Sequence, residues 1–410
     1  MNARTAAGAT ARGARADEWQ ACRDLCERAG QNPSLYDTLT RTDPEHVPDY
    51  VRVVDAGGRP VSLALTIPRR VIVAGIPVEG AVIALVGTDP AHCGRGYAHL
   101  LLEDTAAFLR ARGFRIVLAR GPDGLLGRFG FVPCLDDYRL EFRRPPPGAD
   151  RPPGGSRWRP LEPGDVPSVA RLFASASART PCTVVRPAQP WVWCSGKAGS
   201  GIEVLEAGDA ILAYVRYGDE SERGAAFGVA EVGATATGLL PAVLARVAEK
   251  AAEAGRELIR FSGPPDHPFA RLVELRLSAT VGVRPGVAGQ VLLANRGLLM
   301  ADLVPVFSTA AARRGLPGGT RLVLDIGPKR IELAYSAGVV RLLGGRAGAD
   351  PTGVTRLSAE AFTRLAVGSV AGGEVDLLPG TTVDPDHREV LEVFFPRAFP
   401  HWSPAPYWSA

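Results

Sequence analysis

The stretch AVIALVGTDPAHCGRGYAHLLLEDTAAFL, residues 81–109, decides how this chain of 410 residues is organised. Its first six residues are apolar and predict a strand, which ends at Gly87-Thr88. A polar turn and the sequence Gly94-Arg95-Gly96 follow, and an amphipathic helix is expected over 96–111. Glycines let a ligand approach the backbone closely, and the first turn of a helix presents free N–H groups. The order strand, glycine turn, helix therefore predicts a cradle for an anion such as a phosphate.

The composition is that of an ordinary globular protein long enough for two or three domains. Hydrophobic residues make up 46% and charged residues 22%, and the formal net charge is +4. The basic residues are spread along the chain, which argues against a nucleic-acid-binding patch. The six cysteines are irregularly spaced without a Cys-x-x-Cys pair, so reduced thiols and a cytoplasmic location are expected. No signal peptide, membrane span or metal-binding motif is expected.

The pattern of elements divides residues 1–290 into four segments. Residues 1–15 are small and basic and are expected to be disordered, and the Pro/Gly-rich stretch 145–156 reads as a linker. The first domain, 16–144, combines a helix over 17–29, a hairpin over 50–66 and the strand–turn–helix stretch. The second domain, 157–290, has the same order of elements around a helix over 238–254, but it lacks the Gly-Arg-Gly turn. We interpret it as a divergent internal repeat.

A third domain is expected over 291–410. Its pattern predicts a helix over 303–313, three short strands over 320–345, and a helix over 358–368 with Ser358 as its N-cap. The tail from Phe394 to Ala410 is rich in aromatic residues and proline, which favours a segment packed into a groove over a frayed end.

The stretch from Val86 to Ala98 resembles the coenzyme A loop of GNAT acyltransferases, whose pattern is Gln/Arg-x-x-Gly-x-Gly/Ala shortly after a strand. The later sequence Arg128-Phe129-Gly130-Phe131 is similar to the segment that closes a GNAT fold. The whole plan resembles the enhanced intracellular survival family of acetyltransferases, which has two GNAT domains and a third domain like sterol carrier proteins. The resemblance implies a mixed α/β (α+β) fold: tandem GNAT domains with mostly antiparallel sheets, and a sterol-carrier-protein-like α/β C-terminal domain.

The resemblance also implies that acetyl-coenzyme A is the co-substrate and that no metal is used. Backbone groups of the loop would hold the pyrophosphate, Arg95 would add a charged contact, and the end of the strand would pair with the pantetheine arm. The residues implied in binding the coenzyme are Val86, Gly87, Thr88, Cys93, Gly94, Arg95, Gly96, Tyr97 and Ala98.

Two positions depart from the family pattern. The tyrosine that would protonate the departing thiolate falls at Leu126, and the Gln/Arg at the head of the loop is Cys93. Three interpretations stay open: another group donates the proton, water donates it, or the domain binds an acyl-coenzyme A without turnover. The candidate replacement donors are Tyr97, His99, Cys134 and Tyr138.

The family also places the chain's own terminal carboxylate, here that of Ala410, beside the amine as a base. The expected function is therefore acetyl-coenzyme A-dependent N-acetylation of an amine of a small molecule, by a homo-oligomer without nucleic-acid or membrane partners. The alternative is a catalytically impaired acyl-coenzyme A-binding protein with a sensor or assembly role. Acyl transfer from aminoacyl-tRNA is disfavoured, because the coenzyme A loop is intact and no basic patch is evident.

Overall fold

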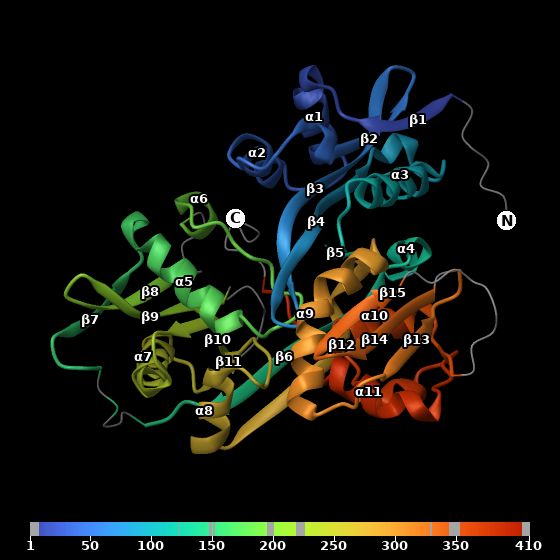
Figure 1. Ribbon diagram of the computed structural model, residues 1–410. Helices are drawn as coiled ribbons and strands as arrows, with labels where there is room; N and C mark the ends of the chain where they lie inside the picture. Colours follow the sequence, from blue (N-terminus) through green and yellow to red (C-terminus); the bar gives the residue numbers. More distant parts are fainter. Residues whose placement is uncertain are drawn as a thin grey trace. The chain divides into compact units, whose positions relative to one another are not determined.

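A computed structural model describes residues 8–121, 123–146, 150, 152–194, 201–218, 226–328, 330–343 and 353–403 (Figure 1). Their contacts group the chain into two compact units, each made of two separate segments. The first unit joins residues 1–135 to 289–398, and the second joins 136–288 to 399–410. This grouping does not set the residues after 290 apart as a unit, and the domain boundaries expected at 144, 156 and 290 stay predictions.

The larger sheet of the first unit has the strand order β1-β2-β3-β4-β5-β12. Neighbouring strands are antiparallel except for β4 and β5, which are parallel. The strands are β1 (Ala9–Gly13), β2 (Val51–Ala56), β3 (Arg59–Val73), β4 (Ile76–Thr88), β5 (Ile116–Ala119) and the end of β12 (Ala279–Leu293). The helices are α1 (Trp19–Arg28), α2 (Pro33–Arg41), α3 (Tyr97–Ala111) and α4 (Asp123–Leu126). The mixed α/β fold class expected from the sequence is confirmed.

Helices α1 and α3 cover opposite faces of this sheet, as the side-chain alternation along β3 and β4 requires. Ala64 and Val86, which are paired across β3 and β4, pack with Tyr97 of α3. Their neighbours Leu63 and Gly87 face the other way, where a Cβ on Gly87 would lie 2.7 Å from the Cβ of Ala29 at the end of α1. Gly87 is therefore needed for the close approach of α1 to β4.

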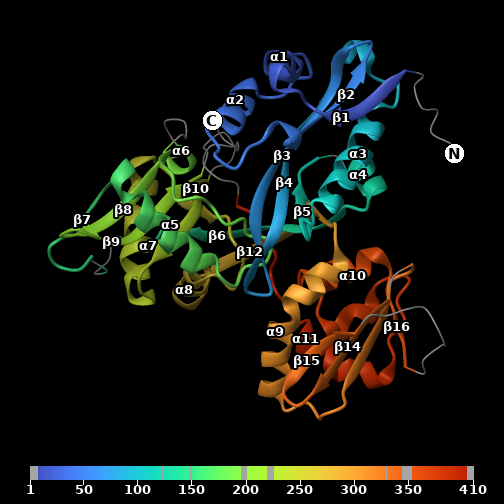
Figure 2. The ribbon, with the colours of Figure 1, turned by 45° about the horizontal axis from the view of Figure 1, so that its top comes forward.

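A smaller sheet in the first unit has the order β15-β14-β13-β16 (Figure 2). Its strands are β13 (Arg321–Asp325), β14 (Arg330–Ser336), β15 (Val339–Leu343) and β16 (Thr355–Arg356). The accompanying helices are α9 (Arg296–Arg314), α10 (Ala359–Ala366) and α11 (Arg388–Phe394). Ser358 caps α10 by accepting a hydrogen bond from the Ala361 N–H at 3.0 Å, which confirms the predicted N-cap.

The second unit has the strand order β6-β11-β10-β9-β8-β7. Its strands are the end of β6 (Val132–Arg143), β7 (Ser156–Pro160), β8 (Ile202–Ala207), β9 (Ala210–Tyr217), β10 (Ala226–Ala234) and β11 (Leu258–Phe261). Its helices are α5 (Val166–Ser177), α6 (Pro190–Trp193), α7 (Leu240–Glu253) and α8 (Pro268–Arg276). In this order of strands, the neighbours β10 and β11 are parallel and the other neighbouring pairs are antiparallel. Helix α7 connects β10 to β11. The same strand–helix–strand crossover connects β4, α3 and β5 in the first unit.

The expected disorder of residues 1–15 is wrong at Ala9–Gly13, which forms β1 and pairs with β2 along its whole length. Its apolar residues Ala9 and Ala11 are too small to give a clear strand signal in the sequence, and the strand is held by backbone pairing and by Arg12. The Arg12 guanidinium lies 2.6 Å from both Glu18 and Asp55. The predicted linker is described in part, since 147–149 and 151 lie outside the described residues.

None of the helices in the described ranges combines the length and the apolar character needed to cross a bilayer.

A buried ion pair fastens the segment after α2 to β3. Arg69 and Asp43 are 3% and 1% exposed at their side chains, and their charged groups are in direct contact. Glu45 adds a second contact to Arg69 at 2.9 Å. The adjacent Arg70 is 62% exposed and lies 3.5 Å from Glu79. Two arginines next to each other in sequence therefore provide a buried pair and an exposed pair for comparison.

We expect Arg69→Met to lower the free energy of unfolding by about 3–5 kcal/mol, because it leaves the Asp43 carboxylate buried without its partner. Arg70→Met, the matched control, should change it by less than about 1 kcal/mol. Urea unfolding followed by circular dichroism measures both values. Equal effects of the two substitutions would contradict the assignment of Asp43–Arg69 as a structural pair.

Candidate functional site

The turn after β4 is built by Asp89. Its carboxylate accepts a hydrogen bond from the Ala91 N–H at 3.0 Å and so caps the short 3-10 helix η3 (Pro90–His92). The other oxygen lies 2.8 Å from the Nε of Arg28, the last residue of α1. The Arg28 guanidinium and the Ala91 N–H hold the pKa of Asp89 below its ordinary value. Asp89 therefore stabilises the turn through both of its carboxylate oxygens.

Two glycines after this turn adopt a backbone that other residues avoid. Gly94 and Gly96 have φ of +76° and +81°, the left-handed region, which costs about 1–2 kcal/mol for a residue with a Cβ. A Cβ at either position would have no atom within 4 Å. Both glycines and the intervening Arg95 are exposed. The loop is thus an exposed run of backbone with open space beside it.

Helix α3 begins at Tyr97, directly after this loop in the chain. Its N-terminus has no side-chain cap and no acidic residue in the first turn, so the helix offers its first N–H groups and the positive end of its dipole. Tyr97 and Leu101 are buried against Val54 and Ala64 and hold this end of the helix to the sheet. Such an N-terminus favours an anion.

Strand β4 has an open edge next to the loop. Its parallel partner β5 pairs only with Gly80–Ile83, from Ile116 to Ala119, and then ends. The pairing of β3 with β4 shifts between Leu85 and Ile83, which makes Ala84 the extra residue of a β-bulge. Residues 85–88 pair with β3 on one side. Among the described residues, no strand pairs with the other edge of residues 84–88. An extended ligand could pair with that edge as an added strand.

The predicted coenzyme-binding residues are thus brought together at one place in the first unit. Val86, Gly87 and Thr88 lie on the open part of β4, and the others form the loop and the start of α3. Arg95 is exposed and adds a positive charge to the loop. Among the residues with described positions, no three His, Cys, Asp or Glu side chains group closely enough to hold a metal ion.

The proton-donor position expected from the family is part of the hydrophobic core. Leu126 is 3% exposed and belongs to the core cluster of the first unit, which includes Ile83, Leu102 and Phe131. If residue 121 had a Cβ, that atom would lie 3.1 Å from the Cδ1 of Leu126. Leu126 can supply no proton, and its side chain fills space in the core.

The replacement donors lie in different surroundings. Tyr97 and Cys134 are buried, and the ring of half-buried His99 lies 4.9 Å from that of Phe129. Tyr138 belongs to the second unit, where its hydroxyl donates to Asp136 at 3.3 Å and its ring packs against Phe399. Ala410 lies outside the described residues. The catalytic roles considered for Tyr138 and Ala410 stay predictions.

The second unit contains a strand opening of the same kind. The parallel pairing of β10 with β11 ends at Val229 and Phe261. Beyond this point β10 continues to Ala234 and pairs with β9 on its other side. The pairing of β10 with β9 shifts between Val229 and Glu231, so Ala230 is the extra residue of a bulge. Ala84 and Ala230 hold the same position in the two crossovers, one residue past the last parallel pair.

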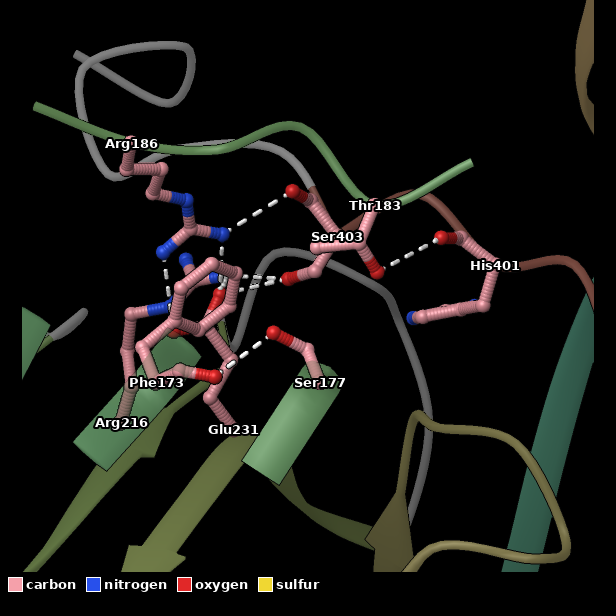
Figure 3. A network of polar contacts seen from close by, with 8 residues as sticks. All are labelled: Phe173, Ser177, Thr183, Arg186, Arg216, Glu231, His401 and Ser403. Carbon is pink, nitrogen blue, oxygen red and sulfur yellow. Dashed lines mark hydrogen bonds and ion pairs between the residues drawn. The ribbon is translucent and has the colours of Figure 1, made fainter. Parts of the chain in front are cut away.

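Charged residues surround the opening in the second unit (Figure 3). Glu231 accepts hydrogen bonds from Arg186 at 2.6 and 3.0 Å and from Arg216 at 2.6 Å. All three residues are buried. Although burial opposes ionisation, the two guanidinium groups lower the pKa of Glu231 to about 2. A cavity of about 40 Å³ lies beside this cluster and is lined in part by Glu231, His267 and His401.

This cluster carries no signal in the sequence that would mark it as a site. Arg186 lies in a segment without regular structure, Arg216 in β9 and Glu231 in β10, so only folding brings them together. A glutamate inside the apolar run of β10 is the single local sign. By contrast, nearby His267 has a purely local contact: it caps α8, since its Nδ1 accepts from the Phe269 N–H at 3.1 Å.

Comparisons with known proteins agree with this geometry. Residues 10–133 match the family model of the acetyltransferase (GNAT) domain. No curated protein sequence matches the chain.

Three solved structures share the fold over nearly the whole chain. A GCN5-related N-acetyltransferase from Anabaena variabilis is 13% identical with a TM-score of 0.72, covering 96% of this chain and 99% of that one. A GCN5-related N-acetyltransferase from Kribbella flavida is 18% identical with a TM-score of 0.71, covering 96% and 97%. Eis1 from Mycobacterium abscessus is 16% identical with a TM-score of 0.66, covering 96% and 99%. At these identities the likeness shows the fold alone.

We expect Leu126→Ala to destabilise the protein by about 2–5 kcal/mol, because it leaves a cavity in the core cluster. Leu125→Ala is the matched control, since Leu125 is only half-buried at the edge of the same cluster and should cost less. Chemical denaturation of both variants gives the comparison. A Leu126→Ala cost below that of Leu125→Ala would mean that the Leu126 side chain is not a core residue.

Proposed function

We propose that this chain is an acetyl-coenzyme A-dependent N-acetyltransferase that acetylates an amine of a small molecule. The observation that carries the proposal is the combination of the Gly94–Gly96 loop, the uncapped start of α3 and the open edge of β4 after Ala84. The match of residues 10–133 to the GNAT domain model supports it independently.

The site's groups suit the parts of an acyl-coenzyme A. The N–H groups from Gly94 to Ala98 would bind the pyrophosphate, and exposed Arg95 would add a charge-assisted contact. The edge of β4 from Val86 to Thr88 would pair with the amide groups of the pantetheine arm. This places the thioester toward the opening between β4 and β5, where a backbone N–H near Val86 would stabilise the oxyanion.

The transfer forms a bond between the amine nitrogen and the acyl carbon and breaks the bond between that carbon and sulfur. The amine loses a proton, for which the carboxylate of Ala410 is the proposed base. The thiolate gains a proton, from water or from a side chain such as that of Tyr138. General acid catalysis contributes about 10²–10⁴-fold, and positioning of the two substrates supplies a further part of the acceleration, so the leucine at 126 does not forbid turnover.

Further parts of the proposal rest on resemblance. The chain is proposed to share the plan of the enhanced intracellular survival family, with a degenerate GNAT domain over 157–290 and a sterol-carrier-protein-like domain over 291–410. The repeated crossover β10–α7–β11 supports the first of these. A homo-oligomer and the absence of nucleic-acid and membrane partners are proposed with them.

A specific observation favours a second candidate function. The buried Leu126 removes the family's proton donor, which is consistent with a protein that binds an acyl-coenzyme A as a sensor or assembly component and does not turn it over.

Calorimetric titration with acetyl-coenzyme A tests the binding site. We expect Gly96→Trp to weaken binding by about tenfold or more, because the strained backbone alone costs about 1–2 kcal/mol and 1.4 kcal/mol is tenfold. The indole would also occupy the open space beside the loop. Gly113→Trp is the matched control: Gly113 has φ +80° and follows the other end of α3. Binding that is equal in the two variants would contradict a site at this loop.

Release of free thiol from acetyl-coenzyme A across a panel of amines separates the two functions. Steady release that depends on the amine is the expected result and excludes the purely binding protein. Tight binding without release from any amine would favour the sensor or assembly role.

A further inference from the structure

The opening between β10 and β11 holds the chain's own C-terminal segment. Trp402 is 2% exposed, and the His401 N–H donates to the Pro181 carbonyl at 2.9 Å. His401 and Ser403 line the cavity beside β10 together with Glu231 and residues that follow β11. In the first unit, the matching opening between β4 and β5 is the proposed acyl site. In the second unit, the same place is taken by the tail.

Ser403 forms a hydrogen bond with each of the three charged residues of the cluster (Figure 3). The Ser403 hydroxyl donates to Glu231 at 2.5 Å and accepts from Arg216 at 3.0 Å. Arg186 donates to the Ser403 carbonyl at 2.9 Å. Hydrogen bonds to charged groups are stronger than those between neutral groups, and burial shields these from solvent. The cluster thus recognises one residue of the tail through both its side chain and its backbone.

The cluster is itself held rigidly. The Arg186 guanidinium lies 4.0 Å from the ring centroid of Phe173 and 5.1 Å from that of Trp193, so the faces of two aromatic rings help to hold it in place. Glu231 is fixed by its place directly after the bulge at Ala230. A receptor that is ordered in advance holds its ligand without a further ordering cost.

The second unit is poorly suited to hold a coenzyme at this place. Its helix α7 follows Thr237–Leu239 and has Pro241 in its first turn, which removes one of the N–H groups that an anion would need. No Gly-x-Gly sequence precedes it, whereas Gly94 and Gly96 precede α3. The two crossovers share a backbone plan and differ in what their openings can bind.

We propose that the second unit is a receptor for the chain's own C-terminal segment, and that Glu231, Arg186 and Arg216 are positioning residues that anchor Ser403 and thereby limit where the terminal carboxylate can reach. The second half rests on the proposed function, in which that carboxylate is the base. Ala410 lies seven positions after Ser403 in the sequence. At about 3.5 Å per residue, they allow a reach of at most about 25 Å from the anchor.

Hydrogen exchange of the full-length chain, read by mass spectrometry over peptides from 395 to 410, tests the anchor. Ser403→Ala removes the hydroxyl contacts, and Glu231→Gln removes the charge while keeping the shape. Both should speed exchange of the tail by about tenfold or more, since charge-assisted hydrogen bonds are lost. Ser177→Ala is the matched control, because it also removes a hydroxyl beside the cavity, and that hydroxyl donates to the Phe173 carbonyl at 2.6 Å. Ser403→Thr, which keeps the hydroxyl, should restore slow exchange.

The positioning role is tested on the same variants by amine-dependent thiol release. With Ser403→Ala we expect kcat/KM for the amine to fall about tenfold, and its pH profile to move to higher pH because the amine must lose its proton without a fixed base. Affinity for acetyl-coenzyme A should be unchanged, and Ser403→Thr should recover both the rate and the profile.

Each outcome decides one part. Tail exchange that is unchanged in both Ser403→Ala and Glu231→Gln overturns the anchor. Faster exchange with an unchanged rate and pH profile overturns the positioning role and leaves the anchor established. A wild-type chain that binds acetyl-coenzyme A but turns over no amine overturns the positioning role together with the enzyme assignment, while the exchange result still decides the anchor.

Discussion

The early end of the parallel pairing between β4 and β5 is the constraint on which the rest of the site depends. The two strands pair over four residues each, and the bulge at Ala84 follows the last pair directly. Beyond it β4 has backbone groups that no described strand satisfies on that side, and unsatisfied backbone groups favour a ligand. The loop at Gly94–Gly96 follows this edge in the chain and leads into α3. In the proposed function, this one irregularity of the sheet would leave room for the thioester, and the loop would receive the phosphates.

The same irregularity occurs twice in the chain and is used in two ways. In the second unit Glu231 follows the bulge at Ala230 and lies at the opening. The buried glutamate forms ion pairs with Arg186 and Arg216. A cluster of this kind is costly to bury unless every charge is paired and hydrogen-bonded. Ser403 completes it, so the tail contributes to the stability of the unit as well as filling its opening. A duplicated plan can thus keep its backbone while the chemistry of its opening changes from exposed glycine to buried charge.

The sequence predicts the elements whose signals are local. Helix α3 and the cap at Ser358 both follow from residues within a few positions of each other. Helix α2 is absent from the sequence prediction, although its start carries a local signal: Asn32 is an N-cap and Pro33 takes the first helical position. The strand–turn–helix stretch was found for the same reason: glycine punctuation and a strong period of apolar residues lie within one short segment.

What the sequence could not show depends on partners far along the chain. Strand β1 consists mostly of small residues and exists because β2 offers it an edge, and the exposed half of β12 contains Pro285 and two glycines, which disfavour a strand. The bulges at Ala84 and Ala230 leave no mark in composition. The core position of Leu126 likewise follows from packing, and the cluster at Glu231 joins a loop, two strands and the tail.

Hydrogen exchange of the full-length chain with and without acetyl-coenzyme A tests the central claim most directly, because it reports on both openings in one experiment. The account predicts protection by the coenzyme in peptides that cover residues 84–100, with none in peptides that cover residues 230–241. Protection at 230–241, or no protection at 84–100, would contradict it.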